Sequence, residues 1–323
     1  MICLGIESTA HTFGVGVIDS NGNILANEKE SFKPELGWGL DPKKVREHHE
    51  ACADSVVKRA LFVSKIEKPD LIAYSAGPGL PPALLVGKGM VEKLSKKWKI
   101  PIAEVNHCVA HLEIGRLISK FQDPIMLYVS GGNTQVIAFE SGKYRVFGET
   151  EDIGVGNLLD TFGRKAGLEF PAGPKIGLLA KQGKKYIAIP YSVKGMDVSF
   201  SGILTKAEHL LKTEKLEDIC YSLTETVYAM LVEISERALA HCQKNELILT
   251  GGVAASTRLQ EMCKIMCDER GAKFSTIPIE LAGDNGAMIA WNGLQIKKYT
   301  KKPDIYPRWR TDEVDITWRK KTI

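Results

Sequence analysis

Two histidines and an aspartate have the residue types and the placement to bind a metal ion. His107 and His111 are spaced i, i+4, so on a helix their imidazoles share one face, roughly 5–6 Å apart at Cβ. His107 follows the apolar stretch 102–106, which predicts that it begins a helix at the end of an interior strand. Asp284 stands at the matching helix start in the second half of the chain, and Tyr128 lies on an apolar strand that leads to the same region. Such a mixed nitrogen and oxygen set suits iron, zinc or another divalent ion.

The same histidines allow two other interpretations. A lone His-x-x-x-His pattern is often a capping histidine followed by a surface histidine, and here only the position after a strand favours a ligand pair. A zinc peptidase needs His-Glu-x-x-His, because the glutamate is its general base. Cys108 occupies that position, and Glu113 lies two residues past the second histidine, on another face of the helix. A peptidase is therefore disfavoured, since its base would have to come from elsewhere.

A glycine pair after an apolar strand indicates a nucleotide site. The stretch 246–250 leads into Gly251-Gly252, where the lack of side chains lets an adenine and its ribose approach the backbone. Thr257 follows at a helix start, where its hydroxyl serves either the ligand or the helix as an N-cap. Asp160 has a carboxylate for ribose hydroxyls, and the rigid turn 171–175 is expected near it.

Two polar turns indicate where phosphate groups bind. Each follows an apolar strand, one at 7–12 and the other at 130–134. Successive backbone N–H groups in such turns form anion-binding concavities. His11 in the first turn is a further candidate for contact with a ligand phosphate, whereas His48 and His49 are expected on an exposed helix without a role.

The elements that carry these residues occur twice along the chain. Strands begin at Ile2 and again at Ile125, and each is followed by a polar turn, a second strand, a hairpin turn and a third strand. Each half then repeats a strand, a helix, a short strand and a helix start. This pattern predicts an α/β chain with the duplicated, two-lobed actin-like ATPase fold that Hsp70-type chaperones and sugar kinases share. In that fold the two polar turns face each other across a central cleft.

We expect three regions within this architecture. Residues 1–121 form the first actin-like lobe, and residues 122–283 form the second. The second lobe includes an insert at about 151–215 that is rich in Gly and Lys. Residues 284–323 supply a C-terminal helix and a tail that cross back to the first lobe.

Composition is that of an ordinary globular protein. Of the 323 residues 44% are hydrophobic and 25% are charged, so a full core can be buried. No apolar run approaches the ~20 residues that span a bilayer. We therefore expect no contact with a membrane. Seven scattered cysteines without a Cys-x-x-Cys pattern indicate reduced thiols, which are typical of a cytoplasmic protein. The net charge of +4 leaves a nucleic-acid partner open, although lysines cluster at 93–99 and 297–302.

Several motifs together resemble one family, the universal tRNA threonylcarbamoyladenosine transferases in their archaeal and eukaryotic form. The likeness runs from Met1 to the tail, where 310–315 is similar to the archaeal and eukaryotic C-terminus. The motifs that carry it are Ile6–Thr12, Ala76–Leu80, Val105–His111, Tyr128–Gln135, Ser199–Gly202 and Gly283–Met288.

The resemblance implies transfer of a threonylcarbamoyl group from threonylcarbamoyl-AMP to N6 of adenosine 37 in tRNAs that read ANN codons. It implies iron as the metal, with zinc and magnesium as alternatives, and ATP as another occupant of the nucleotide site. It implies that His107, His111 and Asp284 are catalytic and bind the metal together with Tyr128. The residues that it implies for the adenylate are Tyr128, Val129, Ser130, Gly131, Gly132, Asp160, Gly173, Gly177 and Thr257, beside the Gly252 turn.

Two departures from the family pattern concern the adenylate. Many members have glutamate where this chain has Gly177, and many have Asn-Asn where it has Ser256-Thr257. The adenylate is therefore expected to be held by fewer direct side-chain bonds. The partners implied are tRNA, a small protein kinase or ATPase subunit, and the other subunits of a KEOPS-type complex.

Two further functions stay open beside the peptidase. An ATPase or kinase of the same fold would need a catalytic carboxylate near the first turn, and Glu7 is available for that role. A scaffold that binds nucleotide without turning it over would need none of the metal chemistry. By contrast, a metal ion that polarises a carbonyl would fit the acyl transfer, which needs no covalent enzyme intermediate.

Overall fold

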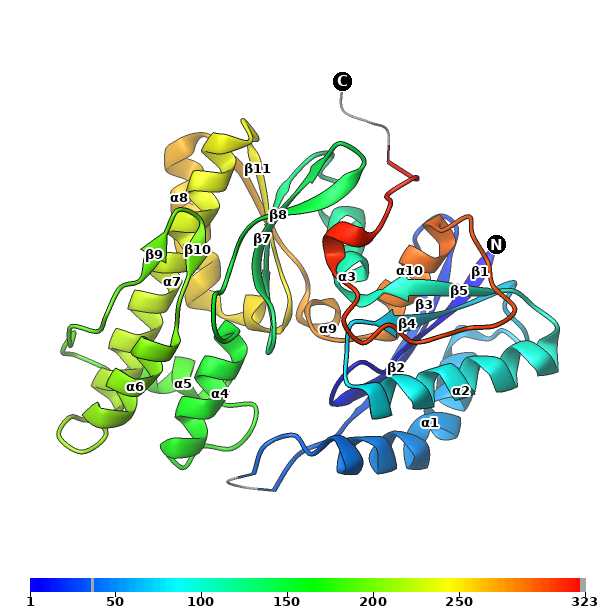
Figure 1. The fold of residues 1–323 in the computed structure, drawn as a ribbon, viewed down its shortest axis with the longest axis horizontal. Coiled ribbons are helices and arrows are strands. Elements are labelled where there is room, and N and C mark those ends of the chain that lie inside the picture. The colour runs from blue at the N-terminus through cyan, green and yellow to red at the C-terminus, as the bar shows by residue number, and fades with distance from the viewer. Residues whose placement is uncertain (36–37, 320–323) are drawn as a thin grey trace.

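The computed structural model describes residues 1–35 and 38–319, which form two lobes around two five-stranded sheets (Figure 1). In the first sheet the strand order is β3-β2-β1-β4-β5. Its strands are β1 (Ile2–Glu7), β2 (Thr12–Asp19), β3 (Ile24–Ser31), β4 (Leu71–Gly77) and β5 (Ile102–Asn106). β1 pairs antiparallel with β2 and parallel with β4, so the carboxyl ends of β1, β4 and β5 share one edge.

The second sheet repeats this arrangement with the order β12-β11-β6-β7-β8. Its strands are β6 (Ile125–Val129), β7 (Thr134–Glu140), β8 (Lys143–Glu149), β11 (Glu246–Thr250) and β12 (Lys273–Thr276). β6 pairs antiparallel with β7 and parallel with β11, as β1 does with β2 and β4. The duplicated actin-like fold expected from the sequence is therefore confirmed.

Helices cover both sheets because their apolar faces need partners. α1 (Pro42–Ser64) and α2 (Pro81–Trp98) bury one face of the first sheet. α7 (Leu216–His241) and α8 (Thr257–Arg270) bury the outer face of the second, and the fully buried Cys263 and Cys267 of α8 belong to that core.

Two helices lie between the sheets. α3 (His107–Ser119) packs against the first sheet through Ala110 and Ile114 and against the second through Val109 and Leu112. α10 (Gly286–Gln295) lies against α3 and the first sheet, where Gly5 allows close contact because an added Cβ would stand 2.2 Å from the Ala290 nitrogen.

The insert between β8 and α7 forms a small subdomain beside the cleft. It contains α4 (Val155–Lys165), α5 (Gly173–Ala180), the two-residue strands β9 (Val193–Lys194) and β10 (Asp197–Val198), and α6 (Ser201–Leu210). Asp152 ties the beginning of the insert to the start of α6, because its carboxylate accepts hydrogen bonds from the backbone of Phe200 and Ser201, both at 2.9 Å.

The short elements η1 (Gly252–Ala255) and α9 (Ile279–Ala282) precede α10 in the chain. After α10, the C-terminal tail contacts both lobes. Thr300 and Tyr306 donate backbone hydrogen bonds to β5 and β4, and η2 (Thr311–Glu313) follows. Ile316 then bonds to the β7–β8 turn, and the Arg319 guanidinium stacks on the Phe139 ring at 3.9 Å. None of the helices in the described ranges is long and apolar enough to cross a membrane.

Candidate functional site

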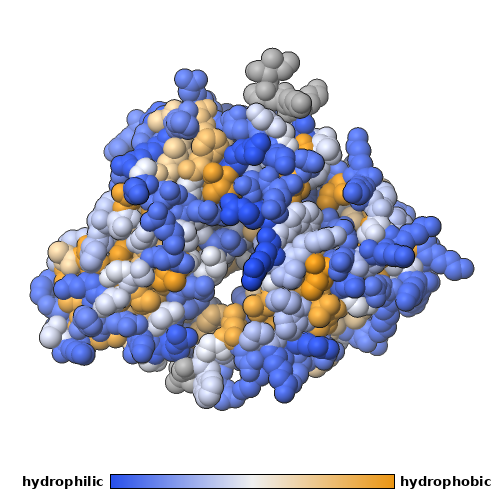
Figure 2. All heavy atoms as spheres, in the orientation of Figure 1, coloured by the Kyte–Doolittle hydropathy of each residue, from blue (hydrophilic) through white to orange (hydrophobic). Residues whose placement is uncertain are grey.

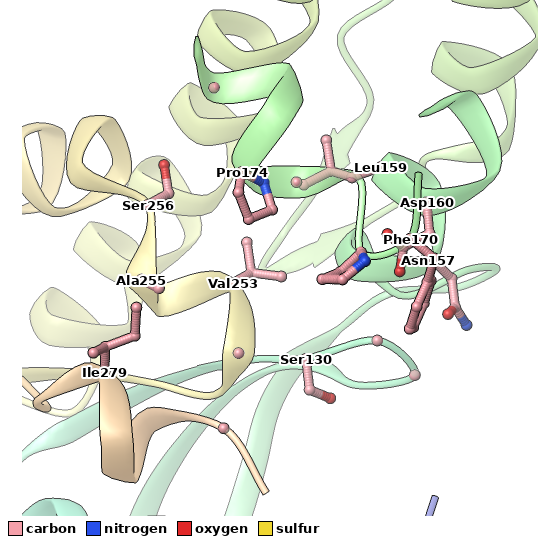
Figure 3. A pocket seen from close by; sticks show the side chains of 18 of the residues that line it. Ser130, Asn157, Leu159, Asp160, Phe170, Pro174, Val253, Ala255, Ser256 and Ile279 are labelled. Atoms are coloured by element: carbon pink, nitrogen blue, oxygen red, sulfur yellow. The ribbon is translucent and has the colours of Figure 1, made fainter. Parts of the chain in front are cut away.

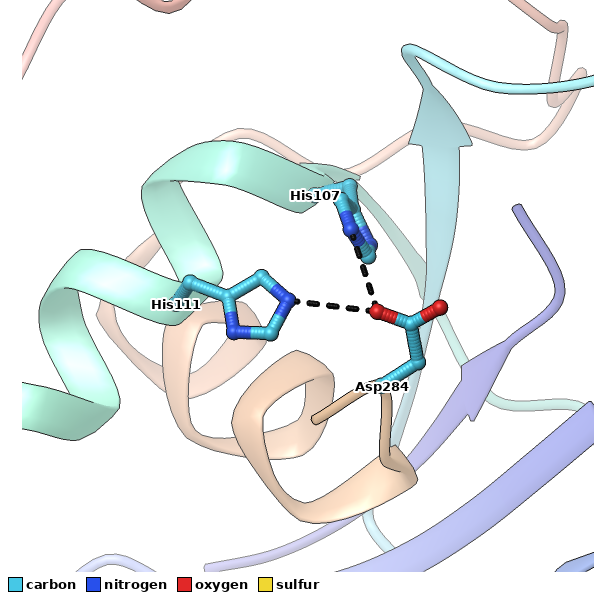
Figure 4. Close-up of side chains that lie close together, drawn as sticks. All are labelled: His107, His111 and Asp284. Carbon is cyan, nitrogen blue, oxygen red and sulfur yellow. Dashed lines mark hydrogen bonds and ion pairs between the residues drawn. The ribbon is translucent and has the colours of Figure 1, made fainter. Parts of the chain in front are cut away.

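Three predicted ligand residues meet at the inner end of the cleft between the lobes. His107, His111 and Asp284 each offer a ligand atom, and these atoms lie within 4.8 Å of one another. Both imidazoles direct Nε2 at one oxygen, Oδ1 of Asp284, at 3.5 Å from His107 and 3.4 Å from His111 (Figure 4). The two histidines are buried, and the aspartate is partly open to the cleft.

Local caps set this geometry. Asn106 caps α3, since its side chain accepts a hydrogen bond from the Val109 backbone at 3.1 Å, and its amide donates to the Trp309 carbonyl of the C-terminal tail. The helix expected from about Asp284 begins two residues later, at Gly286, because Asn285 is the residue that caps it. Asp284 therefore stands in the loop ahead of α10, next to the first turn of α3.

The charges of the cluster support a cation. Burial alone would lower the pKa of His107, but the adjacent Glu7 carboxylate outweighs it and raises the pKa of this imidazole to about 9. Burial lowers the pKa of His111. Burial would raise the pKa of Asp284, yet the hydrogen bond from His111 and the charge of His107 hold it well below its usual range. The two carboxylates thus favour positive charge here, which a divalent ion also supplies.

One buried polar atom beside the cluster fits a metal ion. The hydroxyl of Tyr128 is buried without a hydrogen-bond partner in the part of the chain that the structure describes. Buried polar atoms normally have partners, so this hydroxyl calls for a physical explanation. The Tyr128 ring lies next to the His111 ring, with centroids 5.2 Å apart. A phenol oxygen beside two imidazoles and a carboxylate is a fourth candidate ligand.

From this cluster a cleft of about 1560 Å³ runs outward between the lobes. Figure 2 shows its opening in the middle of the molecule. The first polar turn and the second both line it, and so do His107 and Asp284.

In the first turn, three successive carbonyls accept hydrogen bonds from the first lobe. The Thr9 carbonyl accepts from the Leu80 backbone and the His11 carbonyl from the Phe32 backbone. The Ala10 carbonyl accepts from the His49 ring. The backbone N–H groups of Ser8 and Thr9 donate to the Ser75 hydroxyl and the Glu7 carboxylate, so only the later N–H groups of this turn are left for an anion in the cleft.

The second turn is held by the start of α4. The carbonyls of Ser130 and Gly131 accept hydrogen bonds from the backbone of Gly156 and Asn157, both at 3.0 Å. Gly156 must be glycine for this contact, because a Cβ there would stand 2.7 Å from the Ser130 oxygen. Gly132 lines the cleft between the two anchored ends of the turn.

The outer part of the cleft contains most of the residues expected to bind the adenylate (Figure 3). The lining residues from that set are Ser130, Gly131, Gly132, Asp160, Gly173, Gly177, Gly252 and Thr257. Asp160 of α4 is fixed by accepting a hydrogen bond from the Ala172 backbone at 2.8 Å. Ser256, not Thr257, caps α8, which leaves the Thr257 hydroxyl to the cleft.

Two residues of the expected set do not line this cleft. The side chain of Val129 is fully buried in the core of the second lobe, and Tyr128 is buried beside His111. Gly251 is held close to Val129, since an added Cβ would stand 2.3 Å from the Val129 carbonyl oxygen. Val129 therefore contributes backbone structure behind the glycine turn.

Sequence reasoning missed two buried groups that support the site. His49 is not exposed: it is fully buried on α1 and its Nε2 donates to the Ala10 carbonyl at 3.0 Å, which anchors the first turn. Its position on the apolar stripe of Val45, Ala53 and Val56 was a signal for burial. Glu7 is also fully buried, and its Oε2 lies 2.9 Å from Nδ1 of His107.

Comparisons with solved structures agree with the fold. HypF from T. kodakarensis superimposes with a TM-score of 0.62 at 13% identity, over 91% of this chain and 47% of that one. The activator of the 2-hydroxyisocaproyl-CoA dehydratase from Clostridium difficile, solved with bound ADPNP, gives 0.52 at 11% identity over 91% of this chain and 94% of that one. At these identities the likeness concerns the fold alone.

Comparisons with sequences are more specific. A family model described as tRNA N6-adenosine threonylcarbamoyltransferase matches residues 22–291. The protein of that name from Thermococcus sibiricus is 50% identical over 98% of this chain and all of its own length. A probable bifunctional tRNA threonylcarbamoyladenosine biosynthesis protein from Methanocaldococcus jannaschii is 50% identical over 99% of this chain and 61% of its own length. The chain therefore belongs to the tRNA N6-adenosine threonylcarbamoyltransferase family.

Proposed function

We propose that this chain transfers a threonylcarbamoyl group from threonylcarbamoyl-AMP to N6 of adenosine 37 in tRNAs that read ANN codons. The observation that carries the proposal is the convergence of His107, His111 and Asp284 at the inner end of a cleft whose outer part has the features of a nucleotide site. Family membership supplies the reaction class, acyl transfer to tRNA.

The metal site proposed is formed by His107, His111 and Asp284 with the Tyr128 hydroxyl. A set of two imidazoles, a carboxylate and a phenol favours iron or zinc over magnesium, which prefers all-oxygen coordination. The likeness to the family favours iron of these two. When bound, the ion supplies Lewis-acid polarisation of the carbonyl and stabilises developing negative charge.

The chain's own residues would orient the donor. The backbone of the first turn and of Ser130–Gly132 would hold the phosphate, and the Gly252 turn with Thr257 would hold the adenosine. Asp160 would accept hydrogen bonds from the ribose, and the missing side chains of Gly173 and Gly177 would leave room for it. In this orientation the carbamoyl carbon would lie at the inner end of the cleft, where the N6 amine would attack it.

The transfer itself exchanges one acyl bond for another. A bond forms between N6 and the carbamoyl carbon, and the bond from that carbon to the phosphate oxygen breaks. AMP leaves with the bonding electron pair, and N6 loses a proton. No covalent enzyme intermediate is needed, because the mixed anhydride is already activated.

Contacts of two buried glutamates argue against the alternatives. Glu113, near the second histidine, accepts hydrogen bonds from Tyr144, Arg116 and Gln295, so it does not face the cleft as a peptidase base would. Glu7 is fully buried and both of its oxygens are engaged, which disfavours it as the catalytic carboxylate of an ATPase.

Partners are proposed on the same basis. The relative named as bifunctional extends well beyond the region that this chain matches. We propose that a small protein kinase or ATPase subunit and other KEOPS-type subunits bind this chain, and that ATP also occupies its nucleotide site. With tRNA as the substrate, the reaction belongs in the cytoplasm.

The test separates tRNA binding from chemistry. Transfer of labelled threonine to tRNA is measured for His107→Ala, with donor synthase and partners in excess, and tRNA binding is measured in parallel. Transfer should fall at least about a hundredfold, as expected for loss of a principal electrostatic stabiliser. Binding should stay within about threefold, because phosphate contacts on the surface dominate affinity. His209→Ala, which removes an exposed imidazole of α6, is the matched control and should change neither.

Two results would contradict the proposal. Transfer near the wild-type rate would make the metal structural. A joint loss of binding and transfer would mean that the cluster organises the tRNA site instead of the acyl group.

A further inference from the structure

One buried carboxylate joins the first turn of the cleft to a candidate metal ligand. Glu7 is the last residue of β1 and is fully buried. Its Oε1 accepts hydrogen bonds from the backbone nitrogen of Thr9, at 2.7 Å, and from the Thr9 hydroxyl. Its Oε2 lies 2.9 Å from Nδ1 of His107. The two oxygens thus have separate partners on separate elements.

This contact fixes the tautomer of His107. A carboxylate only accepts hydrogen bonds, so the imidazole must carry its proton on Nδ1. Nε2 faces Asp284 at 3.5 Å, and a metal ion bound there would take the place of the Nε2 proton. His111 has no equivalent support, since its Nδ1 is buried without a partner among the described residues. The two candidate imidazole ligands are therefore unequally organised.

We infer that Glu7 is a positioning residue that orients His107 and sets its tautomer for metal binding, an inference that rests on the metal-dependent function proposed above. Partners of this kind behind a ligating histidine typically contribute 10–100-fold to metal affinity. Glu7 touches neither the metal nor the substrate in this role. It acts through the ring of His107.

An isosteric substitution tests the inference sharply. In Glu7→Gln the Thr9 backbone N–H is a fixed donor, so the amide oxygen must face it. The amide NH₂ then faces Nδ1 of His107 and needs an acceptor there. The imidazole proton moves to Nε2, the atom that should bind the metal. The substitution keeps the shape of the side chain and imposes the wrong tautomer, as in a catalytic triad whose aspartate becomes asparagine.

The experiment titrates the chelator-stripped full chain with Co²⁺ and with Zn²⁺, following the Co²⁺ absorption bands and the competition with a zinc indicator. Glu7→Gln should bind both ions about 10–100-fold more weakly than the wild type. Glu113→Gln is the matched control, because it also removes a buried carboxylate, one that bonds to Tyr144 and Arg116 and not to the cluster. Its metal affinity should stay within about threefold of the wild type.

The outcomes distinguish this inference from the function on which it rests. Wild-type metal affinity in folded Glu7→Gln, or an equal loss in both variants, would overturn the positioning role. A wild-type chain that binds neither ion at this cluster would overturn the proposed function first. If Glu7→Gln does not fold, ¹⁵N-histidine spectra of the stripped wild type give the same answer. At a pH well above about 9, the pKa of His107 in the metal-free chain, the neutral ring should show the Nδ1–H tautomer, and an Nε2–H tautomer would refute the inference.

Discussion

Two adjacent glycines at the end of β11 should respond in opposite ways to substitution. Gly252 lines the cleft, and a Cβ added there would meet nothing within 4 Å. Gly252→Leu should therefore change the free energy of unfolding by no more than about 0.5 kcal/mol, as exposed substitutions usually do. Its side chain would instead fill the space proposed for the adenosine.

Gly251 has the opposite surroundings. Its φ is +94°, and a Cβ there would stand 2.3 Å from the Val129 carbonyl oxygen. With its ψ of 169°, this backbone lies in a region that essentially only glycine occupies, which costs an L-residue roughly 1–3 kcal/mol. Overlap with a backbone atom adds about 1–3 kcal/mol, the usual cost of overpacking. Gly251→Ala should thus lose about 2–6 kcal/mol of stability.

Calorimetric titration with a non-hydrolysable ATP analogue, together with thermal unfolding, separates the two effects. Gly252→Leu should lose at least about tenfold in affinity, equivalent to ~1.4 kcal/mol, at an unchanged Tm. Gly251→Ala should lower the Tm by several degrees. If folded Gly252→Leu binds the analogue as the wild type does, the adenosine lies elsewhere. If Gly251→Ala is as stable as the wild type, the strain argument is wrong.

Two other perturbations have defined outcomes. The double variant His107→Ala/His111→Ala should be purified without stoichiometric metal, whereas Asp284→Ala should retain metal weakly because both imidazoles survive; unchanged metal content in the double variant would exclude the histidines as ligands. Asp152 is an exposed residue. Desolvation alone would raise the pKa of its carboxyl, but hydrogen bonds from the Phe200 and Ser201 backbone outweigh it and lower this pKa to about 2. Asp152→Ala should cost about 1 kcal/mol at neutral pH. Because this pKa is lower in the folded than in the unfolded chain, the ionised carboxylate stabilises the fold above pH ~4, and its contribution is lost as the pH falls towards 2. The urea midpoints of the wild type and Asp152→Ala should therefore converge on acidification.

Much of the fold was predictable because its signals are local or repeated. The strands Ile102–Asn106 and Ile125–Val129 and the helix Thr257–Arg270 lie where their apolar patterns predict them. The duplication predicted topology as well, since two copies of one element order constrain how each sheet is paired. The boundaries between regions stay a prediction.

The support of the site was less accessible because it depends on long-range contacts. Glu7 and His107 are 100 residues apart, and only the shared edge of β1, β4 and β5 brings them together. No periodicity in the sequence reports such a pair. The start of α10 was misplaced for a different reason: Asp284 and Asn285 are both good N-caps, and the observed side-chain hydrogen bond to Met288 selects Asn285.

The position of the cluster also changes what a metal would do to the lobes. Ligands that came from two separate lobes would let a bound ion restrain closure of the cleft. In the structure α3 and α10 pack against each other, and α3 contacts the cores of both lobes. Ligands at the ends of two packed helices keep their separation when the outer cleft opens. The arrangement therefore favours a rigid site for the acyl group and leaves adjustment to the outer part of the cleft, where the insert and the glycine turn would meet the adenosine proposed above.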